Sequence, residues 1–300
     1  MRTKCIVFGL CAAVAALSAT MIGTGCTGCT GSKDAAGELA FDSLTVDTVA
    51  PLLPGTTAPK LTLHMNIQRP SAGQVAQMDG INAMIVSLVP VVGAEGESRG
   101  TDVTETDFDQ YASALVESQI NHYRSDNAEA VQSYSDLSEI QWLNYESYYD
   151  GKVLNQVGNY LSYCMTAYFY TGGAHGSTVC NYGVYDLSRN VQLHLYDITD
   201  DETRPYITAL LANKVLPDYM DKSLNQLKQD GYLFDDAEIA LNDNFYLSEE
   251  GITWVYQQYE LAPYAMGLIP VTLTWFDLQP VLPDDSVLLA LAEQQTAAGE

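Results

Sequence analysis

The sequence predicts an α+β fold in which antiparallel strand hairpins pack against helices, arranged as two intertwined sub-domains. Three observations lead to this prediction. Helical and strand-like patterns come in blocks, without the regular strand–helix alternation that a parallel sheet needs. The centre of the chain, residues 140–187, is rich in tyrosine and β-branched residues, which favour strands. With 47% hydrophobic residues among 300, the chain can bury a substantial core.

The first 25 residues have the pattern of a secretory signal peptide. Arg2 and Lys4 form a short positive region, and the apolar stretch after them ends in small residues. A membrane-spanning anchor is the alternative, because the apolar run approaches the length needed to cross a bilayer. The pattern therefore predicts export, with residues 1–25 as the signal.

The segment after the signal is predicted to be a lipid-anchored tether over residues 26–57. Small residues lead directly into Cys26, as in a bacterial lipobox, although Gly23 stands where an aliphatic residue is usual. Cys29 is a second candidate for the lipid-modified residue. Small, polar and proline-rich residues up to position 57 are typical of a flexible linker.

An N-terminal sub-domain is expected over residues 58–170. Its first strand, 60–68, alternates apolar and polar residues. Residues 72–89 and 104–123 have apolar residues at helical spacing, and Thr106 or Asp107 could cap the second of these helices.

Residues 140–170 are predicted to form tyrosine-rich strands, with Asp150–Gly151 as the turn of a hairpin. Alternate residues of a strand share a face. Packing on a sheet is the common reason for such a row of aromatic residues, whereas an exposed row suits a sugar or protein surface.

A C-terminal sub-domain is expected over residues 171–282, followed by a terminal helix and tail over 283–300. The predicted elements are a strand at 177–187, a helical region at 201–231 broken near Pro217, and strands with tight turns across 244–278.

Motifs of catalysis and cofactor binding are missing from the sequence. It has no G-x-S-x-G, no H-E-x-x-H, no P-loop and no G-x-G-x-x-G after a strand. Its four histidines, at positions 64, 122, 175 and 194, are far apart, and its acidic clusters lack the order of a calcium loop. We therefore expect no metal, no cofactor and a non-catalytic role.

The charge balance bears on partners. The chain has 13 basic and 38 acidic residues, for a net charge of −25. Such a chain repels phosphate backbones, so nucleic acid is not expected as a partner, and it attracts cationic molecules. The alternative is that the charge serves only to keep an exposed protein soluble.

Cys164 and Cys180 are the two cysteines of the predicted folded region. As neighbours on adjacent strands they could form a disulfide in an oxidising compartment. Two buried free thiols are the alternative, because a slipped register would place them on opposite faces.

Three stretches resemble one family. "YTGGAHGSTVCNYGVYDLSRNVQLHLYDI" contains a glycine–histidine turn between strands, followed by the pair Asp186–Leu187, and "YELAPYAMG" follows later. "LHMNIQRPSAGQVAQMDGINAMI" joins a strand through proline to a helix. Together, over residues 58–282, these stretches resemble the RsiV/PdaC family of extracellular domains.

The resemblance implies a sensor or accessory domain of the cell envelope. Members of the family include the outer part of a lysozyme-sensing anti-sigma factor and the N-terminal, non-catalytic part of peptidoglycan deacetylases. We expect neither full activity here, since no anti-sigma segment and no deacetylase domain are recognised. The expectation is a lipoprotein, anchored to the membrane of a bacterial envelope, that binds a cationic protein such as lysozyme, or peptidoglycan.

Two loops are the predicted binding site, because recognition residues commonly lie on loops held by a rigid scaffold. Its candidate residues are Gly172, Gly173, His175, Gly176, Pro263 and Tyr264. The alternative is an enzyme acting on peptidoglycan or another glycan, with His175 as general base or metal ligand. That alternative requires a carboxylate or a second histidine beside His175.

Overall fold

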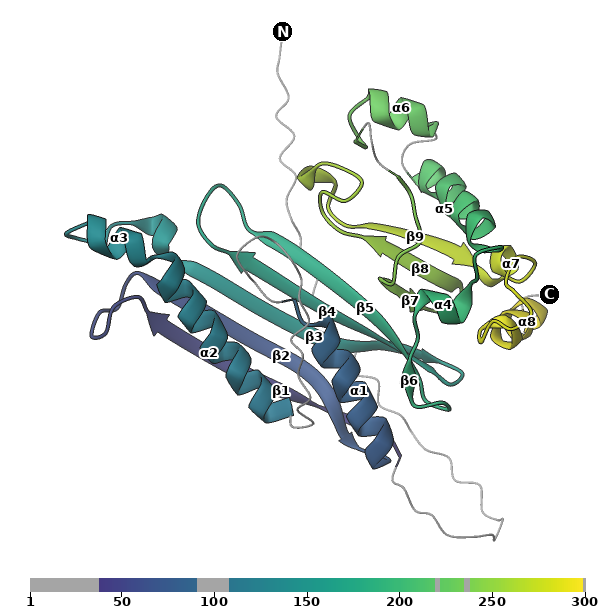
Figure 1. The fold of residues 1–300 in the computed structure, drawn as a ribbon, viewed down its shortest axis with the longest axis horizontal. Coiled ribbons are helices and arrows are strands. Elements are labelled where there is room, and N and C mark those ends of the chain that lie inside the picture. The colour runs from purple at the N-terminus through teal and green to yellow at the C-terminus, as the bar shows by residue number, and fades with distance from the viewer. Residues whose placement is uncertain (1–37, 91–107, 219–221, 235–237, 299–300) are drawn as a thin grey trace, which may run out of the picture. The chain divides into compact units, whose positions relative to one another are not determined.

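The computed structural model describes residues 38–90, 108–218, 222–234 and 238–298 (Figure 1). The predicted signal peptide, Cys26 and Cys29 lie outside these residues, as do the predicted cap residues Thr106 and Asp107. Within the described ranges, no helix combines the length and hydropathy needed to cross a membrane.

The larger sheet has six strands that lie side by side in chain order. They are β1 (Ala40–Pro51), β2 (Lys60–Ala72), β3 (Tyr145–Val157), β4 (Tyr160–Tyr170), β5 (Ser177–Asp186) and β6 (Val191–Gln192). All neighbours are antiparallel except β2 and β3, which are parallel because helices intervene between them.

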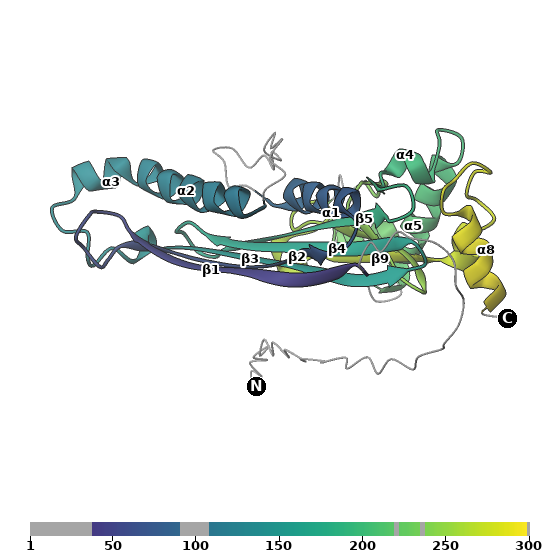
Figure 2. The same ribbon diagram turned by 90° about the horizontal axis from the view of Figure 1, so that it is seen from below.

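Helices cover one face of this sheet (Figure 2). They are α1 (Val75–Leu88), α2 (Phe108–Asp126) and α3 (Ala128–Ser133). Met65, Tyr149 and Ala167 occupy one register row on this face and are buried in a core with residues of α1 and α2. The residues that alternate with them, such as His64 and Tyr148, therefore point to the opposite face.

A second, three-stranded antiparallel sheet is formed by β7 (Phe245–Leu247), β8 (Gly251–Tyr256) and β9 (Ile269–Thr274). Ile207 and Leu211 of α5 (Arg204–Asp218) share its buried core with Trp254 and Leu273. The remaining helices are α4 (Leu195–Ile198), α6 (Leu224–Gln229), α7 (Trp275–Leu278) and α8 (Leu289–Ala298), with single 3-10 turns at Gln141–Leu143 and Tyr264–Met266.

Side chains of the C-terminal region seal the outer edge of β5. The Thr178 N–H donates to Gln258 Oε1 at 3.1 Å, and the Cys180 N–H donates to Gln257 Oε1 at the same distance. The Tyr182 N–H donates to Asn244 Oδ1 at 2.7 Å. These side-chain amides satisfy backbone groups that an unpaired edge would expose, and they fix the segment after β8 beside β5.

These elements confirm the predicted α+β fold and most of its predicted strands and helices. The tether prediction is wrong for residues 40–51, which form β1. Leu44 and Val46 pack partly buried against the core, while Asp42 and Asp47 are exposed. The alternation is that of a half-buried edge strand, but its charged and small residues lower the hydropathy to that of a linker.

The hairpin turn predicted at Asp150–Gly151 is also wrong, because both residues lie inside β3. The turn falls instead at Gly158, where φ is +57°. Gly151 is there for packing: a Cβ at this position would lie 2.5 Å from the Tyr163 hydroxyl. Glycine in a strand interior often marks such a close approach.

The predicted boundary between sub-domains at residue 170 falls in the connection between β4 and β5. These two strands pair along their length, so one sheet crosses the boundary and ends at Gln192. Beyond Gln192 the chain leaves this sheet and builds the region around β7–β9.

Candidate functional site

The two predicted loops meet in space. His175 lies on the connection between β4 and β5, and Tyr264 lies on the turn between β8 and β9. Their rings stack with centroids 4.1 Å apart and planes 23° apart. The Tyr264 hydroxyl also donates to the Gly176 carbonyl at 2.9 Å. The candidate residues from positions 172–176 and 263–264 therefore form one site.

Glycines are required at two positions of the first loop. Gly172 has φ of +91°, and a Cβ there would lie 2.8 Å from the Trp142 carbonyl oxygen. At Gly176 a Cβ would overlap the Tyr168 ring. Gly173 also has a positive φ, and its carbonyl accepts from the Tyr170 hydroxyl at 3.0 Å. The motif therefore holds a tight connection that lies directly on the sheet.

The second loop is shaped by Pro263, whose φ of −57° leads into the 3-10 turn, and by Gly267, whose φ of +70° ends it. The Met266 N–H donates to the Pro263 carbonyl at 2.9 Å and closes the turn. This turn directs the Tyr264 ring onto His175.

His175 has contacts that suit a positioned surface residue. Its Nδ1 lies 3.0 Å from the Gly176 carbonyl oxygen and so donates to it, and its ring stacks on Tyr264. No hydrogen bond or ion pair joins His175 to a carboxylate among the described residues. The described part of the chain also has no group of three His, Cys, Asp or Glu side chains arranged to hold a metal.

An aromatic row leads across the open face of the larger sheet to this pair. His64, Tyr148 and Tyr168 face one another in register on β2, β3 and β4. The centroid of Tyr148 lies 6.4 Å from that of His64 and 6.0 Å from that of Tyr168. Because Gly176 packs on Tyr168, the row continues to His175 and Tyr264. We name these five residues the aromatic strip.

The tyrosines of residues 140–170 divide between the two faces of the sheet. Tyr145, Tyr149 and Tyr163 are buried on the helix-covered side, as packing on a sheet predicts. Tyr148 is 38% exposed on the opposite face, where Tyr168 and Tyr170 are half-buried. Packing on the sheet therefore accounts for the tyrosines of the helix-covered face, and the opposite face carries a partly exposed row.

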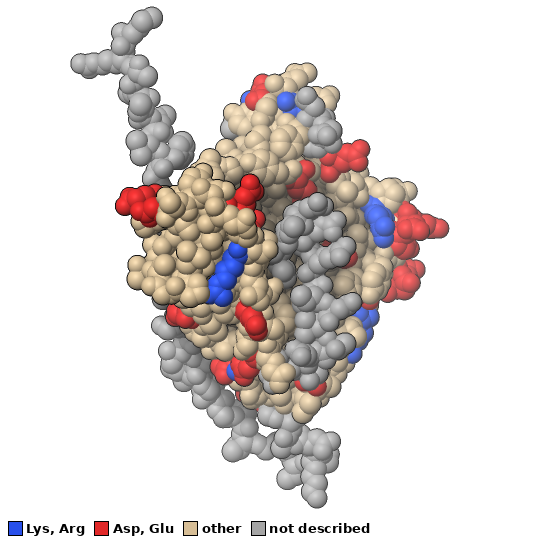
Figure 3. Space-filling model, turned by 60° about the vertical axis from the view of Figure 1, so that its left-hand side comes forward, with Lys and Arg blue, Asp and Glu red and all other residues tan. Residues whose placement is uncertain are grey.

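Carboxylates border the strip. Asp47 Oδ1 lies 2.6 Å from His64 Nδ1, and Glu146 and Asp150 stand on either side of Tyr148 along β3. Burial and then the charge of Glu146 raise the pKa of the Tyr168 hydroxyl. Acidic side chains are also spread over the face of the molecule in Figure 3, with few basic ones among them. The surface offers apolar ring faces in a negative potential.

Cys164 and Cys180 are buried free thiols in the structure, on the same face of the sheet. The Thr166 hydroxyl lies beside both thiols, with its Oγ1 3.6 Å from Cys164 Sγ and 3.3 Å from Cys180 Sγ. A hydrogen bond from Cys180 lowers the pKa of the Cys164 thiol, against the effect of burial. The free-thiol alternative is the one present.

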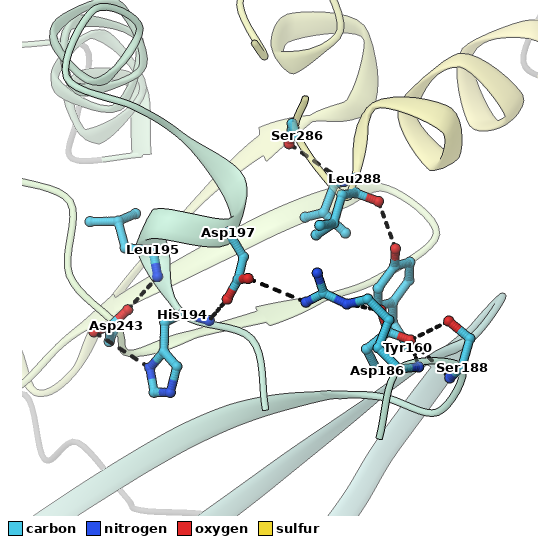
Figure 4. A network of polar contacts seen from close by, with 11 residues as sticks. Tyr160, Asp186, Ser188, His194, Leu195, Asp197, Asp243, Ser286 and Leu288 are labelled. Carbon is cyan, nitrogen blue, oxygen red and sulfur yellow. Dashed lines mark hydrogen bonds and ion pairs between the residues drawn. The ribbon is translucent and has the colours of Figure 1, made fainter. Parts of the chain in front are cut away.

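The Asp186–Leu187 motif has a structural role at the joint between the two regions (Figure 4). Arg189 bridges Asp186 and Asp197, with distances of 2.9 and 3.2 Å. Asp197 also accepts from the His194 N–H at 2.9 Å and caps α4. The motif ties the end of β5 to the start of the C-terminal region.

Two residues of this surface, Asp47 and His64, are not predicted from the sequence. The sequence predicts Asp47 within a tether, and the spacing of His64 from the other histidines gives it no predicted site. Alternation across residues 40–51 was the signal that could have revealed β1, and with it the pairing of Asp47 with His64.

Comparisons with known proteins agree with the fold. Residues 63–178 match the family model "Deacetylase PdaC", and residues 196–275 match "Protein of unknown function (DUF3298)". No curated protein matches. Together with the solved structures below, these matches fit the PdaC/RsiV type of domain and confirm the predicted resemblance.

Two solved structures are similar to this chain. A DUF3298 family member from Bacteroides fragilis is 26% identical, with a TM-score of 0.72, and the match covers 87% of this chain and 99% of the other. A DUF3298 family protein from Pseudomonas aeruginosa is 16% identical, with a TM-score of 0.52 and coverage of 84% and 98%. The similarity to the Pseudomonas aeruginosa structure shows a shared fold alone.

Proposed function

We propose that this chain, which joins a PdaC-type region to a DUF3298 region, is a non-catalytic lipoprotein of the cell envelope that binds a protein or cell-wall ligand. The observation that carries the proposal is the convergence of the two loops at the end of the aromatic strip. The His175 ring stacks on Tyr264, and its Nδ1 is committed to a backbone carbonyl. Such contacts suit recognition better than proton transfer.

The strip has the chemistry of a recognition surface. Tyr148 is 38% exposed, and the His64 side chain is 41% exposed. Aromatic residues at a surface combine apolar faces with polar edges, and few rotatable bonds are immobilised when they bind. Their faces suit the C–H face of a sugar ring or the side chains of a partner protein.

A cationic protein such as lysozyme is the sharper form of the proposal. The net charge of −25 favours encounter with a basic partner, and Asp47, Glu146 and Asp150 carry that negative potential to the strip. Cationic side chains are also attracted to aromatic ring faces.

Export and anchoring complete the proposal. Residues 1–25 act as the signal peptide, and lipid attachment at Cys26 holds the domain at the membrane. Labelling of cells with a radioactive fatty acid tests this: the label is expected in the wild-type chain and absent from Cys26→Ser. If that variant retains the label, Cys26 is not the residue that carries the lipid, and Cys29 becomes the candidate. If the wild-type chain carries no label, the lipid anchor is refuted.

The alternative, a glycan-modifying enzyme with His175 in its site, needs a partner that positions the imidazole. The contacts of His175 in the described structure supply a carbonyl and a ring instead. We therefore favour a binding function over a glycan-modifying activity.

Binding of the full-length chain to a basic lysozyme and to insoluble peptidoglycan tests the proposal. We expect saturable binding of at least one of them, weakened about tenfold by Tyr148→Ala and by His175→Ala, which remove exposed anchor side chains. Tyr206→Ala is the matched control, since Tyr206 is 65% exposed on α5, away from the strip. Binding of neither, or equal effects of all three variants, would refute the proposal.

A further inference from the structure

A pair of thiols lies between β4 and β5, on the face of the larger sheet that α1–α3 leave open (Figure 2). Cys164 alternates along β4 with Tyr163 and Met165, which are buried on the helix-covered side. Cys164 and Cys180 are themselves only 4% and 5% exposed. Neither thiol belongs to the aromatic strip.

The register of the two strands makes the cysteines diagonal neighbours. Cys164 lies opposite Tyr182, and Cys180 lies opposite Thr166. Diagonal neighbours in a sheet lie about 7–8 Å apart, whereas the Cα atoms of a disulfide are usually about 4.4–6.8 Å apart. A disulfide would therefore require the backbone to move.

The two sulfur atoms are nevertheless close together. The thiols are hydrogen-bonded to each other, and the Thr166 hydroxyl oxygen lies 3.6 Å from Cys164 Sγ and 3.3 Å from Cys180 Sγ. A metal ion bound by two thiolates adds two metal–sulfur bonds of about 2.3 Å, whereas a disulfide brings its sulfurs to about 2.05 Å. The diagonal arrangement therefore suits a bridging ion better than an S–S bond.

The groups around the sulfurs favour ionised thiols. A hydrogen bond from Cys180, opposed by burial, lowers the pKa of the Cys164 thiol, and a hydrogen bond from Thr166 adds to this effect. The Tyr182 hydroxyl and the charge of Lys152, which lies opposite Cys164 on β3, lower it further. Burial, and then the charge of Cys164, raises the pKa of Tyr182, so its hydroxyl stays protonated and donates. The thiolate is the form of cysteine that binds metals.

The number and kind of ligands decide which ion fits. Among the described residues, no group of three His, Cys, Asp or Glu side chains is arranged to hold a metal, so they form no four-ligand site of the kind that zinc occupies. Two thiolates are a complete ligand set for a soft monovalent cation, because such an ion accepts linear coordination by two sulfurs. Among the common metals, thiolates favour Cu(I) in this class.

We propose that Cys164 and Cys180 form a binding site for Cu(I). One Cu⁺ and two thiols give a bis-thiolate complex of charge −1 and two protons, which leave to solvent. The complex is shielded from water by the second sheet, since the Tyr246 ring of β7 packs on the Tyr182 ring with centroids 5.1 Å apart. Lys152 offsets its negative charge. This site goes beyond the proposed function.

Competition with the Cu(I)–bicinchoninate complex tests the site. The protein is the reduced full-length chain, kept free of oxygen, whose other cysteines are removed by Cys5→Ser, Cys11→Ser, Cys26→Ser and Cys29→Ser. We expect this chain to take up one Cu(I), with two sulfur neighbours by X-ray absorption.

Further variants of this chain locate the copper. Cys164→Ser and Cys180→Ser are each expected to abolish uptake. Lys152→Ala is expected to weaken it about fivefold, because it removes a nearby positive charge. Lys60→Ala, at an exposed position of β2, is the matched control and should change nothing. Absence of uptake by the parent chain, or uptake that survives in both cysteine variants, would overturn the site.

Two further measurements make the test decisive. If a serine variant fails to fold by circular dichroism, urea unfolding of the parent chain replaces it: Cu(I) should stabilise the chain, and no stabilisation would overturn the site. Oxidised glutathione, which would be reduced to two glutathiones as the pair forms a disulfide, is the second. Complete disulfide formation in a chain that takes up no copper would make the pair a redox site instead. Lysozyme and peptidoglycan binding should not change in Cys164→Ser, so either proposal can fail without the other.

Discussion

Asp186 shows how a single carboxylate joins the two regions of the chain. Its side chain is 2% exposed, yet Oδ1 accepts from the Ser188 N–H at 2.8 Å and from the Ser188 hydroxyl at 2.6 Å. Burial acts to raise the pKa of this carboxyl, but the hydrogen bonds and Arg189 outweigh burial and lower it. The ionised form is therefore the one that stabilises the joint.

Asp186→Asn is expected to lower the free energy of unfolding at neutral pH by about 1.5–3 kcal/mol, the usual contribution of hydrogen bonds to a charged group. Because the folded pKa lies below the unfolded value of about 3.9, this stabilisation is present above that value and is lost as the pH falls through the folded pKa. Urea unfolding across this range measures it, with the exposed Asp284→Asn as control. A wild-type advantage that grew on acidification would contradict this role.

A substitution at Gly151 tests whether this glycine is needed for packing or for a turn. Its missing Cβ leaves room for the Tyr163 hydroxyl, so Gly151→Ala should cost about 1–3 kcal/mol of stability through overpacking. Tyr163→Phe removes the obstructing oxygen, so the double variant should lose less than the sum of the two single losses. A double-mutant cycle by urea unfolding measures the coupling, and additive losses would show that the contact does not matter.

The residue scale also shows where sequence reasoning stops. His175 and Tyr264 could be chosen as candidate residues from loop signals, and the structure brings their rings into contact. Their stacking could not be foreseen, because 88 positions separate the hydrogen-bonded Gly176 and Tyr264 in the chain. A contact of that range depends on the whole fold.

At the scale of the elements, β1 is the strand that the sequence analysis misses, because its low hydropathy resembles that of a linker. Val46 packs partly buried against the core, whereas Val49 on the same strand is 59% exposed. The two valines therefore distinguish a paired strand from a tether.

Val46→Asp should destabilise the chain by about 2 kcal/mol or more, because it places a charge against the apolar core. Val49→Asp is the matched control and should stay within about 0.5 kcal/mol of wild type, as surface substitutions usually do. The midpoint of urea unfolding measures both. Equal, small effects would restore the tether interpretation for residues 40–51.

The side-chain hydrogen bonds that cover the outer edge of β5 are the second feature at the scale of elements. Asn244 accepts from the Tyr182 N–H and donates to the carbonyls of Cys180 and Val255 at 3.1 and 2.8 Å. One side chain therefore links β5 to β8. Periodicity could predict both strands but not this link, since side-chain amides leave no pattern in a sequence.

Asn244→Ala should leave these backbone groups unsatisfied and cost about 1–3 kcal/mol of stability. It should also speed hydrogen exchange of the Tyr182 amide, which loses its acceptor. Asn213→Ala, at an exposed position of α5, is the control and should change neither quantity. An unchanged Tyr182 exchange rate in Asn244→Ala would mean that the seal does not protect the edge.

At the scale of the whole molecule, helices on one face of the larger sheet leave the other face available for the aromatic strip (Figure 2). The second sheet attaches at one end of that open face, where Ser162 Oγ and the Leu247 backbone exchange hydrogen bonds at 3.0 and 3.1 Å. The Tyr264 turn of the same region contacts the His175 loop.

The overall fold could be predicted because it follows from local periodicity and from the motifs that carry the family resemblance. The site could be predicted only as two separate loops. The side chains that join it to the sheet, Tyr148 and Tyr168, belong to a row whose exposed face depends on where the helices pack.

Hydrogen exchange of the full-length chain with and without a saturating basic lysozyme tests the central claim, that the aromatic strip is the binding surface. Two peptides decide the result, one covering residues 170–178 and one covering 259–267. The account predicts that both slow together on binding, with no change in α5. Protection confined to other segments, or no protection at a concentration where lysozyme binds, would contradict it.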